Sequence, residues 1–135
     1  MSYDFLEHIA DVKYRAKGLT VEEMFCFAAE ALNETIRGDI KILEQRAVNF
    51  EIEGKDLENL LYNFLEEFLF LLDSEGFLAA RIESLEIDDL RLKCVVMGDD
   101  ADNYKFTNDV KAVTYNDMFV REKNEEFECQ VVLDV

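Results

Sequence analysis

Histidine is scarce in this chain, and His8 is the only one among 135 residues. The three cysteines, Cys26, Cys94 and Cys129, lie far apart and form no C-x-x-C pair. Because a structural zinc site takes four cysteine or histidine ligands, a tetrahedral zinc site is disfavoured. Each cysteine falls on the apolar face of a predicted element, which indicates reduced core residues and a cytoplasmic protein.

Basic residues are also few, since 14 lysines and arginines face 31 acidic residues for a net charge of -17. Phosphate-rich nucleic acid should be repelled, so we expect no stable direct nucleic-acid binding. The acidity could equally serve solubility alone, and basic protein partners remain possible. No apolar run is long enough to span a membrane, because Glu66 and Glu67 interrupt the best candidate, 64–72. The N-terminus lacks the basic and apolar segments of a signal peptide.

The periodicity of apolar residues predicts one domain over 1–135. Helices are expected at 21–36, after the capping box that begins at Thr20, and at 57–74, after Asp56. Gly98 to Asp109 should be a polar loop. Strands are expected in two pieces between 3 and 17, then at 48–52, 81–88, 90–96, 110–115, 118–121 and 127–133, with a turn at Asn116 and Asp117. This order predicts an α+β fold with a mostly antiparallel mixed sheet packed against two main helices.

Two aspartates near the chain ends are candidate metal ligands. Asp11 and Asp134 both fall on the polar sides of their strands. If these strands are neighbours, the two side chains and the Val135 carboxylate would gather as a site for calcium, magnesium or manganese. The alternative is that both are ordinary solvated aspartates at strand ends.

Lys111 and His8 are weaker candidates. Lys111 shares a strand face with Val113 and Tyr115, so we expect partial shielding and an anionic partner, unless the ammonium group reaches solvent from the strand end. His8 could act as a general base or ligand near Asp11, or could make an ordinary structural hydrogen bond. The loop 98–103 lacks the glycine and glutamate of an EF-hand. No motif for independent nucleophilic catalysis is present.

Five segments, in order along nearly the whole chain, resemble the archease family. They are H-x-A-D ending at Asp11, K-D-L-E-N-L-L at 55–61, L-D-S-E-G at 72–76, V-K-A-V-T-Y at 110–115 and V-L-D-V at 132–135. Any one of these strings is a weak signal, but five at matching spacing make a chance match improbable.

The resemblance implies an accessory protein rather than an enzyme. Archeases activate the catalytic subunit of the GTP-dependent RNA ligase that seals tRNA exon halves. They promote guanylate transfer to the ligase's histidine, allow multiple turnover and can relax nucleotide choice. Carried over by position, the family's metal site falls on Asp11, Asp134 and Val135, with calcium expected and magnesium or manganese as alternatives. The family's functional lysine falls on Lys111.

The chain also departs from the family pattern, and other functions stay open. Ile9 stands where the family often has threonine, Asn116 stands where it often has histidine, and 99–109 lacks the usual proline and histidine. These differences put loop geometry and partner affinity in question. One rival function is a general chaperone or protein-interaction module, and the other is a metal-dependent phosphoesterase.

Overall fold

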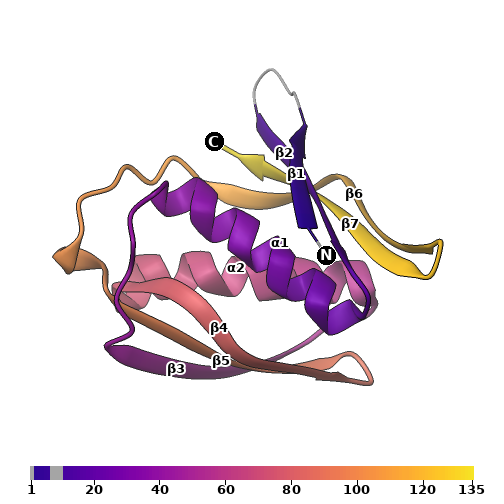
Figure 1. Cartoon of the computed structure of the whole chain (residues 1–135), viewed down its shortest axis with the longest axis horizontal. Helices are drawn as coiled ribbons and strands as arrows, with labels where there is room; N and C mark the ends of the chain where they lie inside the picture. The colour runs from indigo at the N-terminus through magenta and orange to yellow at the C-terminus, as the bar shows by residue number, and fades with distance from the viewer. Residues whose placement is uncertain (1, 7–10) are drawn as a thin grey trace.

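Two helices lie between two separate sheets in the computed structural model, which describes residues 2–6 and 11–135 (Figure 1). One sheet has the strand order β1-β2-β7-β6 and the other β3-β5-β4, and each described pair is antiparallel. The elements are β1 Ser2–Leu6, β2 Asp11–Gly18, α1 Val21–Arg37, β3 Arg46–Glu53, α2 Leu57–Glu75, β4 Phe77–Asp88, β5 Arg91–Asp100, β6 Ala112–Lys123 and β7 Glu126–Asp134. The predicted α+β class is confirmed. The sequence predicted one mostly antiparallel mixed sheet, whereas the structure has two separate antiparallel sheets.

Both helices begin at the caps expected from the sequence. The Thr20 hydroxyl accepts a hydrogen bond from the Glu23 N–H at 3.0 Å, and the Asp56 carboxylate accepts one from the Asn59 N–H at 2.7 Å. These side chains replace partners that the first turn of a helix cannot supply itself. Neither helix in the described part of the chain is long and apolar enough to cross a membrane.

The core is formed where both helices meet both sheets. Helix α1 contacts β2, β7 and β4, while α2 contacts β6, β3 and β4. The rings of Phe25 and Phe64 stack across the helices at 5.6 Å, and Phe68 meets Phe64 edge-on at 5.2 Å. All three cysteines are free; Cys94 and Cys129 are buried as expected, whereas Cys26 is only partly buried.

Two predictions for the last third of the chain were wrong. No turn separates two strands at Asn116 and Asp117. Instead β6 is continuous, and the residues between Thr114 and Phe119 bulge opposite Val131 of β7. The polar loop also begins later than predicted, because β5 continues to Asp100 and a short 3₁₀ turn follows at Ala101–Asn103. Polar residues that lie on an outward strand face look like turn residues when the sequence alone is read.

Candidate functional site

Asp11 and Asp134 lie directly opposite each other, on β2 and β7. Directly paired residues of antiparallel strands project from the same face with Cβ atoms about 5 Å apart. Figure 1 shows the C-terminal end of the chain beside the start of β2. The expectation that the chain ends bring these two aspartates together is therefore confirmed. His8 lies outside the described residues.

Lys111 joins this site through its main chain. Its N–H donates to the Asp134 carbonyl oxygen at 2.8 Å, immediately before β6 begins at Ala112. Its side chain is exposed, so the predicted shielding was wrong and the alternative, a side chain that reaches solvent from the strand end, is confirmed. The strand predicted at 110–115 begins two residues too early, because β6 starts at Ala112 and Lys111 precedes its regular part. The exposed side chain of Lys111 thus starts from main chain that is bonded to Asp134.

The donors at this end suit a hard cation. Two carboxylates about 4 Å apart repel by about 4 kcal/mol at an effective dielectric near 20, and a cation relieves that repulsion. Carboxylate and main-chain oxygens are the ligands that calcium, magnesium and manganese prefer. Within 2–6 and 11–135, no three His, Cys, Asp or Glu side chains are grouped to hold a metal ion. A centre here therefore requires a main-chain oxygen such as one from Val135, together with water.

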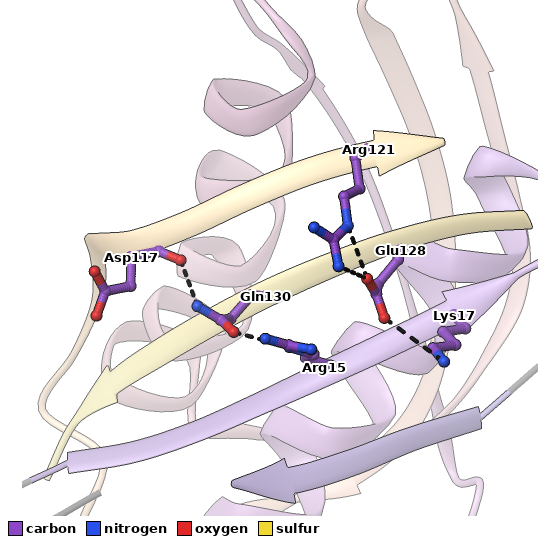
Figure 2. Close-up of polar contacts among 6 residues, drawn as sticks. All are labelled: Arg15, Lys17, Asp117, Arg121, Glu128 and Gln130. Carbon is purple, nitrogen blue, oxygen red and sulfur yellow. Dashed lines mark hydrogen bonds and ion pairs between the residues drawn. The ribbon is translucent and has the colours of Figure 1, made fainter. Parts of the chain in front are cut away.

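A polar network covers the same outer sheet face beyond the aspartates (Figure 2). Arg15 Nε donates to Gln130 Oε1 at 2.9 Å, and Gln130 Nε2 donates to the Asp117 carbonyl oxygen at 2.7 Å. Further along, the Glu128 carboxylate accepts from Arg121 Nε at 2.9 Å and lies 3.6 Å from the Lys17 ammonium nitrogen. The network links β2, β7 and β6 across their outward faces.

Sequence reasoning missed this network. Glu128 and Gln130 are only 6% and 5% exposed, although both lie on the face expected to be wet. The alternation of Lys13, Arg15 and Lys17 was a visible signal for one cationic strand face. Its partners could not be named without the register between β2 and β7.

The bulge of β6 is held from both sides. On the outer side, Asp117 adopts a left-handed φ of 54° and its carbonyl binds Gln130. On the other side, the Tyr115 ring stacks on Tyr62 at 4.2 Å, and its hydroxyl accepts a hydrogen bond from Asn59 Nδ2 at 2.8 Å. Bulges of this kind redirect side chains at a sheet edge, and this one fixes the Asp117 carboxylate near β2.

These features define a class of protein in which two antiparallel sheets enclose two helices. In one sheet, two neighbouring strands, here β2 and β7, place two aspartates opposite each other. Within that class, the chain belongs to the Archease protein family (MTH1598/TM1083), whose model matches residues 3–135. The resemblance identified from the sequence is confirmed.

Relatives match over nearly their whole lengths. The chain is 35% identical to the protein archease of Aeropyrum pernix, with 96% of this chain and 94% of that one covered. It is 38% identical to that of Pyrococcus abyssi, with 86% and 85% covered. The solution structure of Methanobacterium thermoautotrophicum protein 1598 superposes with a TM-score of 0.84 at 28% identity, covering 99% of each chain. A Thermotoga maritima archease, described as a possible chaperone, shares the fold with a TM-score of 0.70 at 20% identity, covering 96% and 94%.

Proposed function

We propose that this protein activates the catalytic subunit of a GTP-dependent RNA ligase in tRNA splicing and is not itself an enzyme. It promotes guanylate transfer onto the ligase's histidine, so that the ligase turns over repeatedly and accepts a broader choice of nucleotides. Family membership supports the accessory role. The observation that carries the proposal is the direct pairing of Asp11 with Asp134, because it concentrates negative oxygens at the end of an outer sheet face.

The same end is proposed to hold a divalent cation. Asp11, Asp134 and a main-chain oxygen of Val135 are the ligands, with calcium the first candidate and magnesium or manganese the alternatives. When bound, the cation supplies positive charge for phosphate oxygens in the ligase centre. The Asp134 side chain is exposed and the Asp11 side chain half-buried, so a docked partner can reach this end.

Lys111 contributes a second positive charge in this proposal. Its side chain is exposed, and its N–H bond to Asp134 keeps the main chain beside the paired aspartates. An ammonium group in such a place neutralises phosphate charge as guanylate is transferred. Lys111→Met should therefore reduce stimulation of the ligase more than Lys111→Arg does.

The decisive experiment counts ligase turnovers on broken tRNA with GTP, with and without this protein. Asp11→Asn and Asp134→Asn should abolish stimulation while leaving the circular dichroism spectrum unchanged. Asp88→Asn is the matched control, because Asp88 is an exposed aspartate at the end of β4 in the other sheet. Full stimulation by both site variants would refute the assignment.

The rival functions are tested with the same preparations. Suppression of aggregation of unrelated proteins, unaffected by Asp11→Asn, would instead support a general chaperone. Phosphoester hydrolysis by the isolated protein with a divalent ion would support an enzyme.

Calorimetric titration with calcium examines the metal centre separately. Deleting Val135 should weaken calcium binding if a main-chain oxygen of that residue is a ligand.

A further inference from the structure

Lys13 lies on the same outer face as the paired aspartates. Only Val12 lies between it and Asp11 along β2, so the two Cα atoms are about 6.6 Å apart. Its partner across the strands is Val132, so Asp134 is its diagonal neighbour on β7, about 7–8 Å away and within reach of a long side chain. The nearest lysine on this face can therefore reach both carboxylates.

The Lys13 side chain is directed elsewhere in the structure. Its ammonium nitrogen lies 3.4 Å from an Asp117 carboxylate oxygen, and the lysine side chain is only 20% exposed. The Asp117 side chain is 64% exposed, so the ion pair is well hydrated and weak. Such a pair opens readily, and the ammonium group has two alternative anionic partners.

The position of Asp117 is set by the hydrogen bonds that hold the β6 bulge. Gln130 donates to its carbonyl oxygen at 2.7 Å, and Arg15 in turn fixes Gln130 (Figure 2). Asp117 also adopts a left-handed φ of 54°, a conformation that aspartate tolerates better than most non-glycine residues and that turns the main chain at the bulge. The network thus places a carboxylate where it can hold Lys13 away from the acidic pair.

We propose that Lys13 competes with the divalent cation for Asp11 and Asp134, and that Asp117 shifts this competition toward the cation by holding the ammonium group. The inference rests on the proposed metal centre and adds two residues that set its affinity. Asp117 is a positioning residue, since it acts through Lys13. In this competition the lysine exchanges between Asp117, where the structure has it, and the acidic pair, and a bound cation excludes it from the pair.

Calcium titration calorimetry of the whole protein tests this. Lys13→Gln should lower the Kd for calcium about three- to ten-fold, as expected from removing a unit charge some 7 Å away across screened solvent. Lys17→Gln is the matched control on the same strand and face, and it should change Kd by less than about two-fold because it lies beyond the Debye length. Urea unfolding of each variant verifies that the fold is retained.

A double-mutant cycle distinguishes competition from simple electrostatics. Asp117→Asn alone should raise Kd, whereas in the Lys13→Gln background it should have little effect. An equal effect of Asp117→Asn in both backgrounds would overturn the competition. An unchanged Kd in Lys13→Gln would also overturn the competition. Calcium binding by the wild type in that experiment would still support the metal centre itself. Binding by Lys13→Gln but not by the wild type would support the inference, and binding by neither would overturn both proposals.

Discussion

Replacing Glu128 with glutamine tests whether the outer-face network stabilises the fold. The Glu128 side chain is 8% exposed, and its carboxylate is shared by Arg121 and Lys17, whose side chains are each 44% exposed. A charge-assisted hydrogen bond contributes about 1.5–3 kcal/mol, but half-exposed cations regain water when the carboxylate is lost. Glutamine also keeps one acceptor for Arg121. We therefore expect Glu128→Gln to lower the free energy of unfolding by about 1–2 kcal/mol.

Urea unfolding at neutral pH measures this loss, and Glu51→Gln is the control. Glu51 pairs with Lys93 at 3.7 Å on the other sheet, where both side chains are largely exposed, so its replacement should cost less than about 0.5 kcal/mol. The slope of free energy against urea should not change. Equal losses in the two variants would refute the argument that burial makes the Glu128 pairing effective.

The pH dependence gives a second readout of the same substitution. Burial raises the pKa of Glu128, but the hydrogen bond and charge of Arg121, with Lys17 and Arg15, outweigh it and hold the pKa below its ordinary value of 4.5. A lowered pKa in the folded state means that the stabilisation is fully present above 4.5 and is lost as pH falls through the folded-state value. The stability gap between wild type and Glu128→Gln should therefore close in acid. A gap that widened there would contradict the assignment.

Three further predictions concern helix capping, sheet packing and encounter with the ligase. Thr20→Ala should cost about 1 kcal/mol in urea unfolding, because the Glu23 N–H loses its acceptor. Gly98→Ala should cost at least about 2 kcal/mol by the same measurement, since a Cβ there would lie 2.2 Å from the Leu78 carbonyl oxygen. Gly76→Ala should cost less, since its Cβ meets nothing within 4 Å and only the positive φ is strained. If the proposed ligase is the partner, the net charge of -17 should steer the protein to a basic face of it, so stopped-flow association should slow as salt rises. A rate indifferent to salt would defeat this steering.

Local signals in the sequence predicted the helices well. Thr20 and Asp56 mark helix starts because their side chains satisfy N–H groups only a few residues away, a contact that sequence spacing encodes directly. The division of strands between two sheets was not predicted. It depends on pairings such as β3 with β5, which join segments about forty residues apart and leave no local trace.

The acidic pair was predicted because each aspartate is defined by alternation within its own strand, and only one assumption was needed to join them. Predicting the role proposed for Asp117 would have required three pieces of information that the sequence does not supply. These were the register of β6 on β7, the bulge that shifts it, and the side-chain amide of Gln130 that reaches across. Alternation fails at a bulge because residues inserted there change which face the next side chain takes. The turn residues Asn116 and Asp117 did mark this irregularity in the sequence. They were interpreted as the end of a strand rather than as a bulge within one.

The outer face of the β1-β2-β7-β6 sheet therefore has two electrostatic parts in a chain of strongly negative charge. Lys13, Arg15 and Lys17 follow one another along β2, and the same strand begins with Asp11. Because cations and the acidic pair share one strand, the net charge of the protein does not describe what a partner docked on this face would meet. A divalent ion at the acidic end would cancel the two carboxylate charges there, because its charge of +2 matches theirs. Binding of the ion should then remove the negative part of this face and leave the β2 cations for the phosphate groups of a docked partner, as the proposed function requires.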